Sequence, residues 1–158
     1  MENKRKSSVF TLSLARTIMW DSGNNVGDIS GHTSVILSGD IRQVRPYRLV
    51  TCGEDYQVNY YEGPPFKLKK MNKVHNNYAT SVKFSPDGEN FISVGYDKKV
   101  VLFDAKESNS EVIADDKKEG SHKSAIVGVH WLNNKEFVTC SLDKTIKVWD
   151  LATRAVTK

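Results

Sequence analysis

The sequence predicts an all-β protein built from repeated four-stranded units. Three segments superimpose, and each runs from a histidine through a short apolar strand to a turn aspartate. The histidines are 43 and 47 residues apart, and the aspartates are 42 and 46 apart. No segment keeps the 3.6-residue apolar period of an amphipathic helix. A repeat of about 40 to 45 residues with G-H and W-D signatures is typical of propeller blades, so the fold class is a WD-repeat β-propeller.

An incomplete repeat precedes the first full one. The pair Trp20-Asp21 stands 41 residues before Tyr61-Glu62, which has the same place in the first full repeat. Residues 17–21 are therefore expected to form the third strand of an earlier blade, with Val26 to Ile29 as its fourth strand. This incomplete blade covers residues 17–30, and residues 1–16 form an atypical N-terminal segment that does not match the repeat.

Three near-complete blades follow the incomplete one. The second has the clearest turn, Ser85 to Gly88 (S-P-D-G), in which Pro at the second position and Gly at the fourth fit a type I turn. Three blades and an incomplete fourth cannot close a ring, and a propeller avoids uncovered edges only when its ring of blades is closed. We therefore expect self-association through the uncovered end blades. The predicted blades cover about residues 31–72, 73–116 and 120–158, which with the incomplete blade make residues 17–158 a partial propeller.

Each blade carries polar residues at matched positions. In WD repeats the loop histidine, a strand Ser or Thr, the turn Asp and the Trp form a buried hydrogen-bonded chain. Tyr61 and Phe103 replace the Trp in the first two blades. The predicted structural network comprises His32, Thr51 and Asp55 in the first blade, His75, Ser93 and Asp97 in the second, and His122, Thr139, Asp143 and Trp149 in the third.

A His–Ser/Thr–Asp set can also be interpreted as the machinery of a hydrolase. However, the set recurs once in every blade, whereas an active site occurs once in a protein. A buried Asp that holds a His also satisfies polar groups that would otherwise cost stability. We therefore interpret these residues as structural and predict no catalytic residue and no enzyme activity.

The sequence offers no metal or cofactor site. The histidines occur once per blade, so they are expected to lie far apart, and no C-x-x-C or H-x-x-x-H spacing is present. Cys52 and Cys140 occupy equivalent strand positions and are expected to be small packed core residues. No glycine-rich phosphate loop occurs.

The composition limits the classes of partner. Of 158 residues, 39% are apolar and 27% charged, as in ordinary globular proteins, and the net charge is +4. No basic stripe is interleaved with aromatic residues, so nucleic acid is not favoured as a partner. No run approaches the roughly 20 apolar residues of a membrane span. Two cysteines make no disulfide framework and indicate a reducing compartment, although the basic start and short apolar run of residues 4–15 leave a signal peptide as the alternative.

The stretch from Trp20 to Lys70 is more particular than the repeat. It contains W-D-S-G, then I-R-Q-V-R-P-Y-R, and then E-G-P-P-F-K from Glu62 to Lys67. These motifs closely resemble the first of the two propellers of the actin-interacting protein 1 family, over about residues 17–153. The resemblance implies a fragment of a cytoplasmic protein of the actin cytoskeleton that promotes filament disassembly together with ADF/cofilin and uses no cofactor.

The resemblance also implies three partner-binding residues. The family has an acidic residue in the turn before the third strand, an aromatic residue after G-P-P and another after the loop histidine. The matching positions are Glu54, Leu68 and Tyr78, of which Leu68 departs from the family's Phe. Leu68 and Tyr78 can equally be residues that pack the blades. The alternatives for function are a generic WD scaffold in another complex and a truncated product with little activity.

Overall fold

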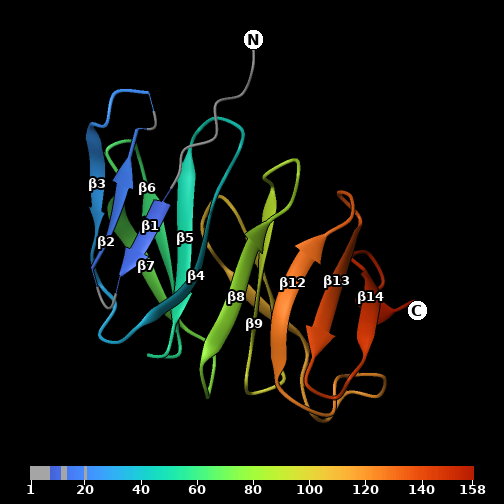
Figure 1. Cartoon of the computed structure of the whole chain (residues 1–158). Helices are drawn as coiled ribbons and strands as arrows, with labels where there is room; N and C mark the ends of the chain where they lie inside the picture. Colours follow the sequence, from blue (N-terminus) through green and yellow to red (C-terminus); the bar gives the residue numbers. More distant parts are fainter. Residues whose placement is uncertain (1–7, 12–13, 20) are drawn as a thin grey trace.

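The computed structural model describes residues 8–11, 14–19 and 21–158. These residues form fifteen β-strands and no helix. The strands make one three-stranded sheet and three four-stranded sheets, all antiparallel, which lie side by side like the blades of an open fan (Figure 1). The prediction of an all-β, partial WD-repeat propeller is confirmed.

The first sheet begins earlier than the sequence predicted. It consists of β1 (Ser8–Thr11), β2 (Leu14–Ile18) and β3 (Asn25–Ile29), in that order. β2 covers the first two residues of the strand expected over 17–21, and β3 covers the expected fourth strand from Val26 to Ile29. β1 and the start of β2 lie within residues 1–16. That segment carries no repeat motif that would identify it. Trp20, on which the expected strand was based, lies outside the described residues.

Three four-stranded sheets follow, which we call blades A, B and C. Blade A comprises β4 (Ile36–Ile41), β5 (Arg48–Gly53), β6 (Gln57–Glu62) and β7 (Lys67–Lys73). Blade B comprises β8 (Ala79–Phe84), β9 (Asn90–Gly95), β10 (Val100–Asp104) and β11 (Ser110–Ala114). Blade C comprises β12 (Ile126–Trp131), β13 (Glu136–Ser141), β14 (Ile146–Asp150) and β15 (Ala155–Val156).

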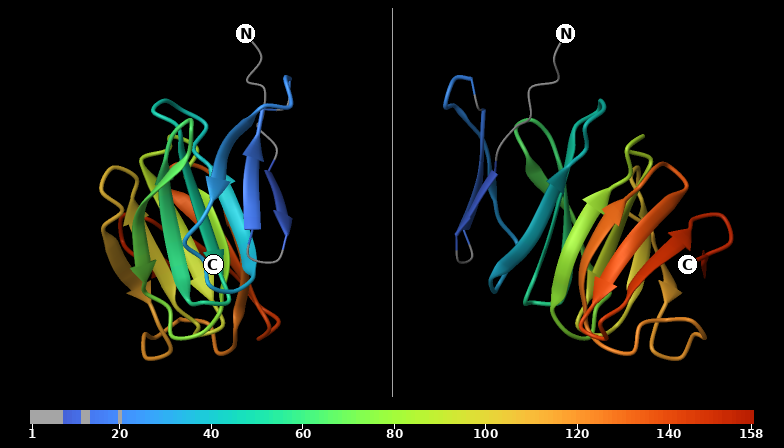
Figure 2. Two further views of the ribbon diagram at one scale, coloured as in Figure 1. Left: turned by 90° about the vertical axis from the view of Figure 1, so that its left-hand side faces the viewer. Right: turned by 45° about the vertical axis from the view of Figure 1, so that its right-hand side comes forward.

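The first strands of neighbouring blades are tied together directly. The Asp40 carboxylate of β4 accepts a hydrogen bond from the Phe84 amide of β8 at 2.9 Å. From β8, the Thr80 hydroxyl donates to the carbonyl of Ile126 in β12 at 2.7 Å, and the Trp131 indole of β12 donates to the carbonyl of Lys83 at 3.0 Å. Figure 2 shows β4, β8 and β12 side by side as a result.

Apolar side chains fill the spaces between the sheets. Because successive strand residues point to opposite faces, each blade sends one set of side chains to the preceding sheet and another to the following one. In blade A, Leu49 and Tyr61 pack towards the first sheet, whereas Val50, Cys52 and Tyr60 pack towards blade B. The core is thus a series of layers, one between each pair of neighbouring sheets.

Two segments that carry the family resemblance join neighbouring sheets. Arg42, which is buried, donates from Nε to the carbonyl of Gly88 at 2.7 Å and pairs with Glu89 at 3.2 Å, linking blade A to the S-P-D-G turn of blade B. The amide of Phe66 donates to the carbonyl of Val26 at 2.7 Å. A Cβ at Gly27 would lie 2.8 Å from backbone atoms of Phe66, and Gly27 has a φ of +152°, so only glycine fits there.

One flank of blade C is uncovered within the described residues. Cys140 and Ile146 occupy the positions of Cys52 and Val58 in blade A, which are fully buried against blade B. Cys140 is exposed and Ile146 is 71% exposed. The expectation that Cys140 is a packed core residue is therefore wrong, because no described sheet covers this side of blade C. We call this surface the open flank.

The two cysteines are expected to differ sharply in reactivity. Burial raises the pKa of the Cys52 thiol well above its ordinary value, and the thiolate is the reactive form. Iodoacetamide should therefore modify Cys140 in the folded protein and Cys52 only after unfolding. Mass spectrometry of peptides from a short labelling pulse measures both sites, and equal labelling of Cys52 and Cys140 under native conditions would contradict the burial of Cys52.

Candidate partner-binding surface

A buried polar chain of hydrogen bonds runs through blade C. The Trp149 indole donates to the Thr139 hydroxyl at 2.8 Å, and Thr139 Oγ1 lies 2.7 Å from His122 Nε2. His122 Nδ1 lies 2.9 Å from the Asp143 carboxylate. An ionised carboxylate can only accept, so Nδ1 carries the proton and Nε2 accepts from the hydroxyl. The hydrogen bonds therefore run in one direction, from the Trp149 indole to Thr139, from Thr139 to His122 and from His122 to Asp143.

Blades A and B contain variants of this chain. His32 lies 2.9 Å from Asp55 and 2.7 Å from Thr51. Tyr61, at the Trp position, has its hydroxyl 3.4 Å from Thr51 Oγ1 and donates to the carbonyl of Ser30 at 2.7 Å. In blade B, His75 lies 2.9 Å from Asp97 and 2.7 Å from Ser93. Phe103 has no polar atom with which to continue that chain. The structure thus brings together the predicted residues within each blade, and each blade keeps its own set.

The turn aspartates also hold the loops around them. Asp97 accepts hydrogen bonds from the amide of Asn76 at 2.8 Å and the amide of Lys99 at 3.2 Å. Burial raises the pKa of Asp97, but the bond and charge of His75 and these two amides outweigh burial, so the pKa lies below its ordinary value. The carboxylate is therefore ionised at neutral pH and joins the loop before β8 to the turn after β9.

The geometry of these sets favours the structural interpretation over catalysis. The side chains of His32, His75 and His122 are at most 1% exposed, so a substrate has no access to the hydroxyls that they hold. Within residues 8–11, 14–19 and 21–158, no three His, Cys, Asp or Glu side chains are grouped as metal binding requires. The same residues contain no helix that is long and apolar enough to cross a membrane.

Two of the three predicted partner-binding residues lie at the same end of neighbouring blades. Glu54 follows β5, and its amide donates to the carbonyl of Val35 in the loop before β4 at 2.9 Å. Tyr78 occupies the equivalent of Val35 in blade B, where its carbonyl accepts from the amide of Tyr96 at 2.9 Å. Glu54 is half-buried, and Tyr78 is 40% exposed.

Tyr78 is the middle ring of three. Its centroid lies 6.0 Å from that of Tyr56 in blade A and 5.9 Å from that of Tyr96 in blade B. Tyr96 is 42% exposed, and we call the three rings the tyrosine row. Sequence reasoning missed Tyr56 and Tyr96. Each adjoins a turn aspartate, one following Asp55 and the other preceding Asp97, and this adjacency is the signal that could have identified them.

Leu68 lies elsewhere. It is half-buried and packs with Leu49, Tyr61 and Phe66 in the layer between the first sheet and blade A. Its Cδ2 lies 2.7 Å from the place of a Cβ at Gly31, which shows how closely it fills that layer. Tyr78 instead contacts Tyr56 and Tyr96, where blades A and B meet. The structure therefore does not bring Leu68 to the tyrosine row.

Comparison with known proteins agrees with this architecture. The family model described as "WD domain, G-beta repeat" matches residues 66–104 and 117–150. The chain is 47% identical to Actin-interacting protein 1-2 of Arabidopsis thaliana over 72% of its length and 18% of that protein. It is 41% identical to WD repeat-containing protein 1 of Xenopus tropicalis, over 85% of the chain and 22% of the relative.

A third relative extends the likeness to insects. The chain is 39% identical to Actin-interacting protein 1 of Drosophila melanogaster over 86% of its length and 22% of that protein. It therefore spans about a fifth of the length of the curated relatives that it matches. The motifs, the repeats and these identities together place the chain in the actin-interacting protein 1 family of WD-repeat proteins.

Proposed function

We propose that this chain is a non-catalytic binding module that promotes actin filament disassembly together with ADF/cofilin, in the cytoplasm and at the actin cytoskeleton. The observation that carries the proposal is the tyrosine row, because its central ring is the position that the family resemblance assigns to partner binding. Two relatives are named actin-interacting proteins, which supports the actin part of the proposal.

The tyrosine row has the properties of a protein-binding surface. Exposed tyrosines contribute strongly at interfaces, since they offer a large ring and a polar hydroxyl at little cost in side-chain entropy. Tyr78 is held in place on both sides, because its amide donates to the side-chain oxygen of Asn77 at 2.8 Å and its carbonyl accepts from the amide of Tyr96. Glu54 adds a negative charge at the same end of blade A. The surface is therefore largely formed before a partner arrives.

Cosedimentation with actin filaments tests the proposal. The chain is expected to pellet weakly with bare filaments and more strongly with cofilin-decorated ones. Loss of a central interface tyrosine typically costs about 2 kcal/mol, so Tyr78→Ala should weaken binding to decorated filaments about 30-fold. Leu132→Ala is the matched control, because Leu132 is 54% exposed in the turn after β12, at the opposite end of the blades.

The outcome also separates the proposal from its alternatives. If cofilin does not enhance binding, and a pull-down finds a partner that binds without cofilin, the chain is a generic WD scaffold in another complex. If neither partner is bound by a folded chain, the alternative of a truncated product with little activity is favoured. Equal loss in Tyr78→Ala and Leu132→Ala would remove the tyrosine row from the proposed interface.

We also propose that the chain self-associates through the open flank. Ile146 is 71% exposed on this face and Cys140 is exposed, whereas the equivalent residues of blades A and B, Val58 and Val100 for Ile146 and Cys52 and Val94 for Cys140, are fully buried against the next blade. Sedimentation velocity over a range of concentrations is expected to show dimers or larger species. Ile146→Lys should shift the distribution towards monomer, and a concentration-independent monomer of the unmodified chain would refute this proposal.

A further inference from the structure

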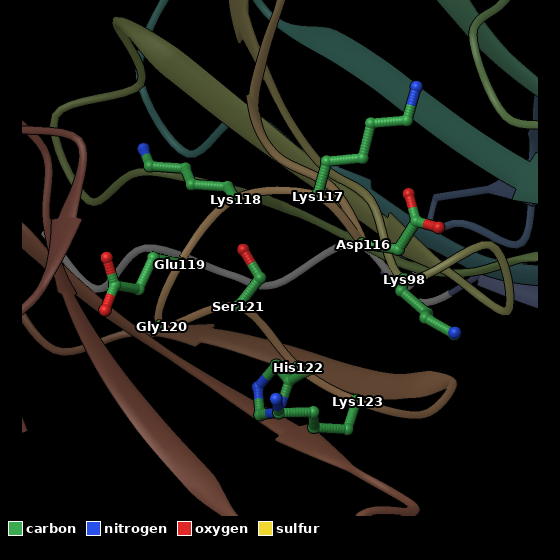
Figure 3. Close-up of a pocket in the computed structure, with 9 residues that line it drawn as sticks. All are labelled: Lys98, Asp116, Lys117, Lys118, Glu119, Gly120, Ser121, His122 and Lys123. Atoms are coloured by element: carbon green, nitrogen blue, oxygen red, sulfur yellow. The ribbon is translucent and has the colours of Figure 1, made fainter.

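A pocket lined by lysines lies between the turn after β9 and the loop that joins β11 to β12. Its volume is about 260 Å³. Lys98 lines it from the turn, and Lys117, Lys118 and Lys123 line it from the loop (Figure 3). The loop that joins blade A to blade B, between β7 and β8, is shorter. It is also separate from the tyrosine row, although Lys98 is only two residues from Tyr96.

Three of the four ammonium groups are free to bind a ligand. Lys118 is already engaged, because its Nζ donates to the carbonyls of Ile113 and Arg154 and so anchors the loop. Lys98, Lys117 and Lys123 have no side-chain hydrogen bond or ion pair in the part of the chain that the structure describes. Lys117 and Lys123 are exposed and Lys98 is half-buried, and rotation about their long side chains can bring the charges over the pocket.

The acidic residues of the pocket do not cancel this charge. Asp116 and Glu119 line the same space, so the lysines outnumber the carboxylates by four to two. Both carboxylates point away from the side chain of Ser121 in Figure 3, and both residues are exposed. The lining of the pocket therefore carries a net positive charge.

Ser121 gives independent evidence for a ligand. It is only 6% exposed, and its hydroxyl has no hydrogen-bond partner among the residues that the structure describes. In Figure 3 that hydroxyl points towards the loop segment of Lys117 and Lys118, into the space that they enclose. Buried polar groups in native proteins are nearly always satisfied, so this hydroxyl is available to donate to an acceptor from outside the chain. Blade A has Gly31 at this position and blade B has Val74, neither of which can donate from a side chain.

We propose that this pocket binds a small soluble anion of the phosphate class. One oxygen of the anion accepts a hydrogen bond from Ser121 Oγ, while Lys98, Lys117 and Lys123 neutralise its charge. The volume exceeds that of a single phosphate, so pyrophosphate or a small organic phosphate fits better than the inorganic ion. The step is binding only, since His122, the imidazole of the lining, is already engaged by Asp143 and Thr139.

Calorimetric titration of the whole chain at low salt tests the proposal, with inorganic phosphate and pyrophosphate as separate probes. Pyrophosphate is expected to bind saturably and more tightly than phosphate. The variant Lys117→Ala/Lys123→Ala should weaken binding of pyrophosphate at least ~10-fold. The matched control is Lys67→Ala/Lys73→Ala, which removes two exposed lysines from β7 and should leave the affinity unchanged. Equal loss in both double variants would mean that only net charge attracts the anion and would overturn the proposal, as would no saturable heat with either probe.

The Ser121→Ala variant tests whether the Ser121 hydroxyl takes part in binding or whether the lysines alone attract the anion. Without ligand this variant should melt at the same temperature as the unmodified chain or slightly higher, because it removes an unsatisfied buried hydroxyl. Pyrophosphate should raise the melting temperature of the unmodified chain, since a ligand that binds only the folded state stabilises it, and should raise that of Ser121→Ala much less. An equal rise in both proteins would show that Ser121 takes no part in binding.

Discussion

Replacing Phe91 with alanine is expected to lower the free energy of unfolding by about 3–5 kcal/mol. Phe91 is fully buried in β9, where three other aromatic rings surround it. Its centroid lies 4.5 Å from that of Phe103, 5.2 Å from that of Phe84 and 6.0 Å from that of Tyr60. Since Tyr60 belongs to blade A and the others to blade B, the truncation leaves a cavity in the layer that joins the two blades.

Urea denaturation followed by fluorescence measures this change. Val112→Ala is a suitable control, because Val112 is 50% exposed on β11 and such surface changes usually alter the stability by no more than about 0.5 kcal/mol. Phe91→Leu should fall between the two, since it retains part of the buried volume. A loss below about 1 kcal/mol for Phe91→Ala would mean that the two blades do not share a packed layer.

Replacing Asp97 with alanine is expected to cost about 3 kcal/mol of stability. The change leaves His75 Nδ1 and the amides of Asn76 and Lys99 without their acceptor in a buried setting. Asp97→Asn should cost less, because its amide oxygen can still accept from His75. Asp116→Asn, at an exposed position, is the control and should be close to neutral. Equal stability of Asp97→Ala and the unmodified chain would contradict a structural role for this carboxylate.

The same carboxylate contributes to acid sensitivity. Because the pKa of Asp97 is lower in the folded chain than its ordinary value of 3.8, the unfolded chain binds that proton more tightly. The stabilisation is therefore present above pH 3.8 and is lost as the pH falls towards the folded pKa. In Asp97→Ala this part of the pH dependence should disappear, and denaturation curves recorded between neutral pH and about pH 3 measure the difference.

The sequence predicts the blades because the repeat is local in each of them. A histidine, a strand, a turn aspartate and the next strand follow one another at nearly fixed spacing, so His75, Ser93 and Asp97 could be grouped without coordinates. β1 has no such motif, and its place in the first sheet depends on pairing with β2. The exposure of Cys140 depends on whether another sheet covers blade C. The residue pattern of β13 alone does not indicate this.

The tyrosine row and the lysine-lined pocket were beyond sequence reasoning for a related reason. Tyr56 and Tyr96 are 40 residues apart and meet Tyr78 only because blades A and B pack together. The charged residues of the β11–β12 loop resemble an ordinary solvated connection, and only the burial of Ser121 within that loop distinguishes it. Features between blades arise from packing, whereas features within blades arise from the repeat.

The layered packing also makes stability unequal along the chain. Blade B has a sheet against each of its faces, whereas blade C within the described residues has one against a single face. In arrays of repeated units, each unit gains most of its stability from its neighbours, and end units open most easily. Amide protons of β9 and β10 should therefore exchange with solvent only when the whole array unfolds, while those of β14 and β15 also exchange through local fraying.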